Sequence, residues 1–304
     1  MPKVLLLVSR NAEEYRRLLD AAQLPELELT TTPGPECEVA FGEPALIREA
    51  LPHLPRLKWA QAIWAGVEPL MQAGLRRDYV LTNARSVFGP LMSEYVFAYL
   101  LLHERKVLQR LENQQEAKWD KTITGTVRGK TMGLLGVGSI GAHVASTAKH
   151  FGMTVHGFTR SSESSPVVDG YFHEDLPAFA AGVDYLVCIL PNTPATRHLV
   201  DASVIAALPP HALLVNAGRG ATLDEAALAQ ALSDGRIAAA VLDVFEQEPL
   251  PADHVFWRTP NLFITSHTAA PSFPSDIAEV FVENYMRYLN AEQLKYRVDF
   301  ERGY

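Results

Sequence analysis

Three ionisable side chains in this sequence each follow a short run typical of a buried strand: Arg219 follows residues 213–218, Glu248 follows 241–245 and His267 follows 263–266. Open parallel sheets bind their ligands at the carboxyl ends of the strands, so this shared position predicts a shared site. Taken singly, each residue has a structural explanation, as a surface arginine, a helix-start glutamate and a capping histidine. Together they are a set of groups that can bind charge and move protons.

The elements that would position these residues form a long alternation of apolar runs with amphipathic segments of helix length. The expected strands cover residues 4–8, 38–41, 57–63, 80–83, 131–135, 154–158, 185–190, 212–215, 238–242 and 262–265. Strands that alternate with helices indicate parallel βαβ units. A helix expected from residue 91 to about 117 separates two such series. The pattern therefore predicts two α/β domains with parallel sheets, joined by one long helix.

Composition excludes several classes of protein. The chain has 304 residues, 48% of them hydrophobic and 20% charged, which excludes extensive disorder. A net charge of −8 argues against a nucleic-acid or anionic-membrane partner. Cys37 and Cys188 belong to no C-x-x-C pair or His/Cys cluster, so no metal site is expected. The start of the chain is typical of a strand and no run approaches the ~18 apolar residues of a membrane span, so we expect a cytoplasmic protein.

A glycine-rich turn lies between an expected strand and an expected helix, at Gly136, Gly138 and Gly141. Such a turn allows a tight bend, a close approach to a pyrophosphate and close packing of helix on strand. The helix start, with Ser139 and Ile140, would offer free N–H groups to phosphates. The motif alone is weak and could be an ordinary turn. Its strand–turn–helix context predicts a dinucleotide site.

The end of the next strand indicates which dinucleotide is bound. An NAD site would have an acidic residue about 20 residues after the turn, and here Arg160 stands at that strand end. A guanidinium can bind a 2′-phosphate in bidentate fashion, with the hydroxyl groups of Thr159, Ser161 and Ser162 as further donors. The alternative is a solvated loop arginine. We therefore predict that NADP(H) is preferred.

Four segments carry a family resemblance: residues 136–141, 216–220, 242–249 and 265–270. They resemble the successive signatures of the D-isomer-specific 2-hydroxyacid dehydrogenases, and the similarity covers essentially the whole chain. Within that family, residues 190–194, 249–251 and 302–304 resemble those of bacterial NADPH-dependent glyoxylate/hydroxypyruvate reductases. The resemblance implies hydride transfer from NADPH to the keto carbon of a small 2-oxo acid, giving the D-2-hydroxy acid.

The resemblance also implies an architecture. It implies two Rossmann-like domains, a flavodoxin-like substrate domain of residues 1–94 plus 275–304 and a dinucleotide-binding domain of residues 95–274. It further implies a homodimer. Leu190, Pro191, Ala217 and Gly218 would complete the cofactor site.

By the same resemblance, Arg219 would bind the substrate carboxylate and stabilise charge on the keto oxygen. His267 would donate the proton during reduction, and Glu248 would hold the imidazole and favour its protonated form. Asp243 would bind the carboxamide side of the nicotinamide. The family usually has proline before the histidine, and Ser266 replaces it here, which puts only the rigidity of this loop in doubt.

The first domain would supply the rest of the substrate site. Residues 63–68 resemble a family loop in which the N–H groups of Ala65 and Gly66 bind the carboxylate. Trp64 would narrow the pocket or simply pack between domains. Trp119 matches a tryptophan that in relatives reaches the partner subunit's site, although interface packing alone explains it equally well.

Two other functions stay open. A reductase of a larger 2-oxo acid would share every motif, because one methylene changes binding in a pocket by only about 1–3 kcal/mol. A non-catalytic nucleotide-sensing protein could keep the same three ionisable residues. Oxidation of NADPH in the presence of glyoxylate distinguishes an enzyme from such a sensing protein.

Overall fold

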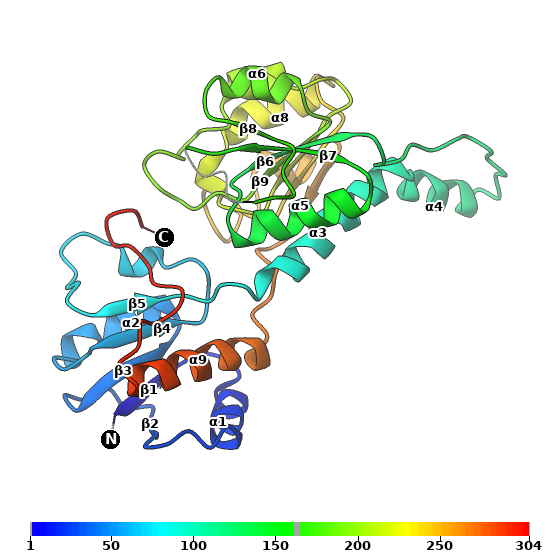
Figure 1. The fold of residues 1–304 in the computed structure, drawn as a ribbon. Helices are drawn as coiled ribbons and strands as arrows, with labels where there is room; N and C mark the ends of the chain where they lie inside the picture. The colour runs from blue at the N-terminus through cyan, green and yellow to red at the C-terminus, as the bar shows by residue number, and fades with distance from the viewer. Residues whose placement is uncertain (1, 161–164, 304) are drawn as a thin grey trace. The chain divides into compact units, whose positions relative to one another are not determined.

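The computed structural model of the chain describes residues 2–160 and 165–303. The chain divides into two compact units (Figure 1). One unit contains the residues up to Val87 and those from Ser272 onward, and the other contains Phe88–Pro271. In the part of the chain that the structure describes, no helix combines the length and the apolar character needed to cross a membrane.

The first unit is built on a parallel sheet with the strand order β2-β1-β3-β4-β5. Its strands are β1 (Lys3–Leu7), β2 (Glu28–Thr30), β3 (Cys37–Gly42), β4 (Trp59–Ala62) and β5 (Val80–Thr82). Its helices are α1 (Ala12–Ala21), α2 (Pro44–Ala50) and α9 (Pro274–Leu289), with short 3-10 turns η1 (Leu51–His53) and η2 (Glu68–Leu70). Helix α9 packs against the sheet through stacked aromatic rings. The ring centroid of Phe281 lies 4.4 Å from that of Phe41 and 5.3 Å from that of Trp59. This stack fixes the C-terminal helix to a sheet made from the N-terminal residues.

The second unit is built on a larger parallel sheet, with the strand order β12-β11-β10-β9-β6-β7-β8. Its strands are β6 (Thr131–Leu135), β7 (Thr154–Phe158), β8 (Gly170–Phe172), β9 (Tyr185–Cys188), β10 (Leu213–Asn216), β11 (Ala239–Leu242) and β12 (Leu262–Ile264). Its helices are α3 (Phe88–Glu104), α4 (Val107–Gln115), α5 (Ser139–His150), α6 (Leu176–Ala181), α7 (Ala202–Ala207) and α8 (Glu225–Ser233), with turns η3 (Gly220–Thr222) and η4 (Val255–Arg258).

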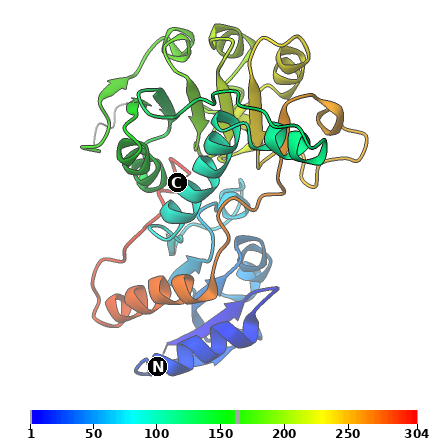
Figure 2. The same cartoon turned by 90° about the vertical axis from the view of Figure 1, so that its right-hand side faces the viewer.

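Helices cover both faces of this larger sheet (Figure 2). One apolar core joins the sheet to α3 and α5, and a second joins it to α6, α7 and α8. Strands β9, β10 and β11 are therefore buried throughout, which explains their nearly continuous apolar sequence. The prediction of two α/β units with parallel sheets is confirmed.

The prediction of one long helix from residue 91 to about 117 is wrong. The chain forms α3 and then α4, with Lys106 between them in the left-handed region at φ +49°. The break follows Glu104, a buried carboxylate that pairs with Lys130 and accepts a hydrogen bond from the hydroxyl of Tyr185 at 2.7 Å. The returning chain also binds here, because the N–H of Gly125 donates to the carbonyl oxygen of Glu104. These contacts end α3 at the sheet, and α4 lies away from the sheet of its unit (Figure 1).

Candidate active site

The three ionisable residues follow neighbouring strands of the larger sheet. Strands β10, β11 and β12 are parallel and adjacent, so the loops that carry Arg219, Glu248 and His267 leave the same edge. His267 Nδ1 lies 2.8 Å from Glu248 Oε2, and both side chains are partly exposed, at 53% and 35%. Because Nδ1 is used by the carboxylate, Nε2 is the ring nitrogen left to act on a bound molecule.

Each member of this pair shifts the pKa of the other in the direction that favours its charged form. The hydrogen bond from Glu248 is the largest influence on His267 and raises its pKa, against burial and the nearby charge of Arg219, which lower it. Burial is the largest influence on Glu248 and opposes its ionisation. The hydrogen bonds from His267 and from the N–H of Phe245 outweigh burial, so the pKa of Glu248 is lowered. The pair therefore favours an imidazolium next to a carboxylate.

Arg219 is held at the end of β10 by its own loop. Its Nη1 donates to the carbonyl oxygen of Gly218 at 2.7 Å. Asn216, which is 1% exposed, donates through Nδ2 to the carbonyl oxygen of Arg219 and accepts the N–H of Gly218. Arg219 also lowers the pKa of both Glu248 and His267 by its charge, so the three groups share one electrostatic environment. Asn216 was not predicted from the sequence to have a role, although a polar residue at the end of an apolar strand is a signal for one.

Asp243 binds the loop that carries His267. It is 2% exposed, and three successive main-chain N–H groups donate to it. His267 N–H binds its main-chain oxygen at 2.8 Å, while Thr268 N–H and Ala269 N–H bind its carboxylate at 2.8 and 3.0 Å. His267 has a left-handed backbone, with φ +56°, which costs energy in a residue other than glycine. These bonds stabilise that conformation, so the loop is held although Ser266 replaces the proline usual in the family.

A hydroxyl relay extends this arrangement to helix α3. The hydroxyl of Thr265 donates to Asp243 Oδ1 at 2.5 Å and lies 2.8 Å from the hydroxyl of Tyr95. Since the only hydroxyl proton of Thr265 is used toward Asp243, Tyr95 donates to Thr265. Burial raises the pKa of Tyr95, which keeps it a donor. Neither Tyr95 nor Thr265 was singled out from the sequence, because the contact joins elements 170 residues apart.

The glycine-rich turn after β6 fits a pyrophosphate. Gly136 has φ +98°, and a Cβ on Gly141 would overlap the carbonyl oxygen of Gly136, so both positions need glycine. At Gly138 no atom of the described residues lies within 4 Å of where a Cβ would be, so the backbone there is accessible to a ligand. Helix α5 begins at Ser139, followed by Ile140, and no side chain in the described part of the chain caps it. Its first N–H groups are therefore available for phosphate oxygens.

The other predicted cofactor residues lie along the same edge of the sheet. Thr159 and Arg160 follow β7, and the side chain of Arg160 is exposed. Leu190 and Pro191 follow β9, and Ala217 N–H donates to the carbonyl oxygen of Cys188, so the loops after β9 and β10 run side by side. Ser161 and Ser162 lie outside the described residues.

The predicted substrate residues come from other segments. Trp64, Ala65 and Gly66 follow β4 of the first unit, with Trp64 41% exposed. Trp119 follows α4 in the second unit and is 88% exposed. Helix α4 lies away from the sheet of its unit (Figure 1).

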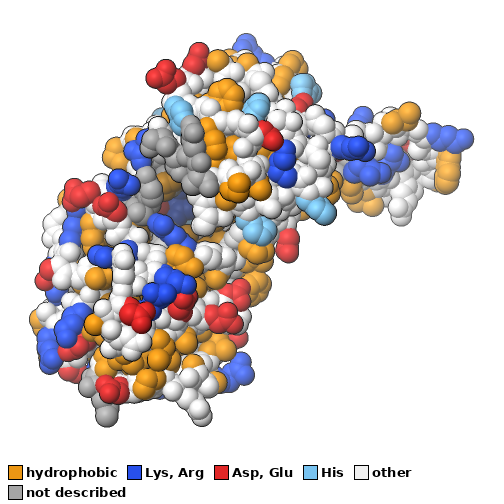
Figure 3. Space-filling model, viewed as in Figure 1, with side chains coloured by type: hydrophobic (Ala, Val, Ile, Leu, Met, Phe, Trp, Pro, Cys, Tyr) orange, Lys and Arg blue, Asp and Glu red, His pale blue; other side chains and the backbone are white. Residues whose placement is uncertain are grey.

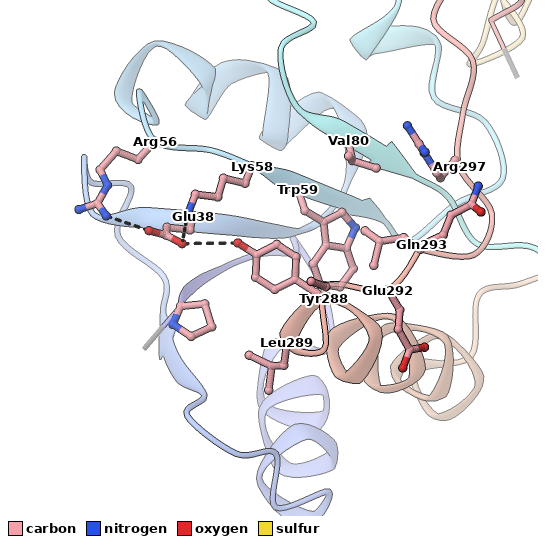
Figure 4. Close-up of a pocket in the computed structure, with 13 residues that line it drawn as sticks. Glu38, Arg56, Lys58, Trp59, Val80, Tyr288, Leu289, Glu292, Gln293 and Arg297 are labelled. Carbon is pink, nitrogen blue, oxygen red and sulfur yellow. Dashed lines mark hydrogen bonds and ion pairs between the residues drawn. The ribbon is translucent and has the colours of Figure 1, made fainter.

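A separate hollow of about 620 Å³ lies in the first unit, at the amino ends of its strands and not at their carboxyl ends (Figure 4). Lys58, Trp59 and Val80 line it at the amino ends of β4 and β5. Glu38 forms ion pairs with Arg56 and with Lys58, each at 2.8 Å, and accepts a hydrogen bond from Tyr288. The polar groups Glu38, Arg56, Lys58 and Tyr288 thus pair with one another, and none of the residues predicted to be catalytic lines this hollow. Within the described ranges, no group of three or more His, Cys, Asp or Glu side chains could hold a metal ion.

Comparison with known proteins identifies the family. Residues 97–269 match the model of the D-isomer specific 2-hydroxyacid dehydrogenase, NAD binding domain. The chain is 34% identical to glyoxylate/hydroxypyruvate reductase A of Serratia proteamaculans over 291 residues, which cover 91% of each chain. This chain therefore belongs to the D-isomer specific 2-hydroxyacid dehydrogenase family.

Two solved structures are similar over nearly their whole length. One is a D-isomer specific 2-hydroxyacid dehydrogenase family protein from Aeromonas salmonicida subsp. salmonicida, 42% identical with a TM-score of 0.91, covering 98% of this chain and 99% of that one. The other is an NADPH-dependent glyoxylate/hydroxypyruvate reductase from Sinorhizobium meliloti in complex with NADP and sulfate. It is 27% identical with a TM-score of 0.90 and covers 100% of both chains.

Proposed function

We propose that this protein is an NADPH-dependent reductase of small 2-oxo acids, with glyoxylate and hydroxypyruvate as the first candidates and a D-2-hydroxy acid as the product. The observation that carries the proposal is the His267–Glu248 pair at 2.8 Å, at the strand edge that also carries Arg219. Membership of the family supports the reaction type. The names of the relatives in Serratia and Sinorhizobium support the substrate and the cofactor.

The residues of the site would divide the work as follows. Bound NADPH supplies the hydride. The guanidinium of Arg219 binds the substrate carboxylate and stabilises the negative charge that develops on the keto oxygen. The imidazolium of His267 gives its Nε2 proton to that oxygen, and Glu248 keeps the ring charged and oriented. Asp243 would contribute by binding the nicotinamide carboxamide, as the resemblance implies, and by holding the loop of His267.

The glycine turn and the end of β7 would hold the cofactor. The first N–H groups of α5 would bind the pyrophosphate, with Leu190, Pro191, Ala217 and Gly218 along the neighbouring loops. Arg160, with Thr159, Ser161 and Ser162, would bind the 2′-phosphate. Arg160→Asp is expected to weaken NADPH binding by about 100-fold and NADH binding far less, because only NADPH carries that phosphate. An unchanged ratio of the two dissociation constants would remove Arg160 from the site.

The decisive experiment is a kcat/KM panel of 2-oxo acids measured with NADPH and with NADH. Highest values for glyoxylate and hydroxypyruvate with NADPH are the expected result. Highest values for phenylpyruvate or a branched 2-oxo acid would identify the larger-substrate alternative instead. Tight NADPH binding with no turnover of any 2-oxo acid would identify a nucleotide sensor and overturn the proposed reaction.

The segment around α4 supports a homodimer. Its large apolar side chains stand open to solvent: Val107, Leu108, Leu111, Trp119 and Ile123. Figure 3 shows hydrophobic and basic side chains on this segment, which lies away from the sheet. Such a surface fits a second copy of the chain, whose site Trp119 would reach. Leu111→Asp is expected to convert the dimer to a monomer in light scattering. Wild-type protein that is monomeric would end this part of the proposal.

The cytoplasm is the proposed compartment. Cys37 and Cys188 are both buried and unpaired, which fits a reducing environment. Fractionation of cells that produce the tagged full-length chain tests this.

A further inference from the structure

We infer that Asn83 is a positioning residue for the loop that binds the substrate carboxylate. This inference rests on the proposed function, and specifically on the role of the Ala65 and Gly66 N–H groups. Asn83 follows β5 in the first unit and is 3% exposed. Its side chain reaches the neighbouring loop after β4, where Nδ2 donates to the carbonyl oxygen of Ala65 at 2.7 Å.

Two successive carbonyl groups of this loop are bound in the same way. Besides the bond from Asn83 to Ala65, the N–H of Ala84 donates to the carbonyl oxygen of Trp64 at 3.1 Å. The two carbonyl groups therefore face the segment that follows β5. In a trans peptide the C=O of one residue and the N–H of the next point in opposite directions. The N–H groups of Ala65 and Gly66 consequently face away from Asn83 and Ala84.

Those two N–H groups are the ones that an anion needs. Among the hydrogen bonds of the described residues, neither Ala65 N–H nor Gly66 N–H has an acceptor. Successive N–H groups on one side of a loop form a concavity that binds carboxylates and other anions. Asn83 thus fixes the direction of the Gly66 N–H without contacting the substrate itself.

The orientation of the Asn83 amide follows from its bond to the carbonyl oxygen of Ala65. Oδ1 is buried and has no hydrogen-bond partner among the described residues. A buried acceptor without a donor is destabilising and rare in folded proteins. Turning the amide over would place Oδ1 against the carbonyl oxygen of Ala65, so the observed orientation is the one that the loop requires.

The backbone of Asn83 is itself anchored. Its N–H donates to the carbonyl oxygen of Tyr296, and Val298 N–H donates to Leu81. The hydroxyl of Ser86 also donates to that of Tyr296. The C-terminal segment therefore holds the end of β5, and Asn83 transmits that position to the loop.

The test compares Asn83→Asp and Asn83→Ala with Asn284→Asp. Asn284 is a matched control: it is 1% exposed, lies in the same unit, and its Nδ2 donates to the carbonyl oxygen of Lys295 and to Gln61. Asn83→Asp keeps the shape but replaces the donor by an oxygen that repels the Ala65 carbonyl. It is expected to raise the KM for glyoxylate by about 10- to 100-fold, with a much smaller change in kcat. Asn83→Ala is expected to raise it less.

The measurements are KM and kcat at saturating NADPH, the dissociation constant of oxalate as a carboxylate probe, and Tm. Asn284→Asp is expected to lower Tm while leaving KM and oxalate binding unchanged. A KM within about twofold of wild type for both Asn83 variants, or an equal rise in KM for Asn284→Asp, overturns the assignment while the proposed function stands. Wild-type protein without 2-oxo acid reductase activity overturns the proposed function and the assignment with it. If Asn83→Asp does not fold, Asn83→Ala decides.

Discussion

Two loops of this molecule are held through different main-chain groups, one through its N–H groups and the other through its carbonyl groups. In the loop that carries His267, three successive N–H groups are bound by Asp243. In the loop after β4, the carbonyl groups of Trp64 and Ala65 are bound, by Ala84 and Asn83. One loop therefore uses its donors for its own structure, and the other uses its acceptors.

The difference decides what each loop can offer to a ligand. In the loop of His267 these three N–H groups are already bound, so the loop can act on a ligand through the imidazole side chain of His267. A loop whose carbonyl groups are bound offers its N–H groups, which bind an anion without any charged side chain. Under the proposed function, the first arrangement would serve proton transfer and the second would serve recognition of the substrate carboxylate. Mutations in the two loops are therefore expected to separate kcat from KM.

The largest effect is expected for His267→Ala. Loss of the proton donor should lower kcat by about 10²- to 10⁴-fold, while NADPH binds as before. His211→Ala is the control, since His211 Nε2 lies 2.7 Å from Asp184 in the same sheet, just before β10 begins. Stopped-flow or steady-state oxidation of NADPH measures the rate. Near-wild-type turnover of His267→Ala would show that another group supplies the proton.

Asp243→Asn should have the next largest effect. It removes an acceptor of main-chain N–H groups, whereas Asn83→Asp removes a donor to a main-chain carbonyl group. The substitution at Asp243 replaces one carboxylate oxygen by an NH2 group, which cannot accept a hydrogen bond from the N–H of Thr268 or Ala269. The backbone around His267 therefore loosens. We expect kcat to fall by about 10- to 100-fold with little change in the KM for glyoxylate. Steady-state kinetics and the dissociation constant of NADPH measure the two contributions. If only NADPH binding weakens, Asp243 acts on the nicotinamide and not through the loop.

The sequence predicted the edge of the sheet at which Arg219, Glu248 and His267 meet. This was possible because parallel strands place their carboxyl ends together, so the position of a residue just after a strand defines its place in space. The glycine turn at residues 136–141 was predictable for the same reason, since its spacing encodes a strand, a turn and a helix.

The supporting contacts were not predictable. Tyr95 and Thr265 meet only because α3 packs beside β12, and Asn83 meets Ala65 only through the register of β4 and β5. Neither pair leaves a periodic pattern in the sequence. The break between α3 and α4 was missed because it depends on Glu104 meeting Lys130 from another element. The edge strands β2 and β8 were missed because they are partly exposed and their residues do not form a continuous apolar run.

Glu248→Gln is expected to change the pH dependence more than the maximal rate. Because the pKa of His267 is raised chiefly by Glu248, the imidazolium persists to higher pH, and reduction is lost as the pH rises through that raised value. A neutral glutamine removes the charge, so the pKa of His267 falls and the loss moves to lower pH. We expect about tenfold less activity on the alkaline side and nearly wild-type activity on the acid side. A kcat/KM profile with glyoxylate measures this, and an unmoved alkaline limb would contradict it.

The smallest effect is expected for Tyr95→Phe, which removes the outermost donor of the relay to Asp243. The hydroxyl of Thr265 would keep its bond to the carboxylate but lose the polarising bond from Tyr95, so the loop should loosen only slightly. We expect kcat to fall by about two- to threefold and the KM for glyoxylate to stay unchanged. Tyr99→Phe is the control, because Tyr99 lies one turn along α3, with its ring centroid 5.0 Å from that of Tyr95, and contacts Phe263. If Tyr95→Phe instead raises the KM for glyoxylate and leaves kcat unchanged, Tyr95 acts on substrate binding. The separation of kcat effects in the His267 loop from KM effects in the loop after β4 would then be wrong.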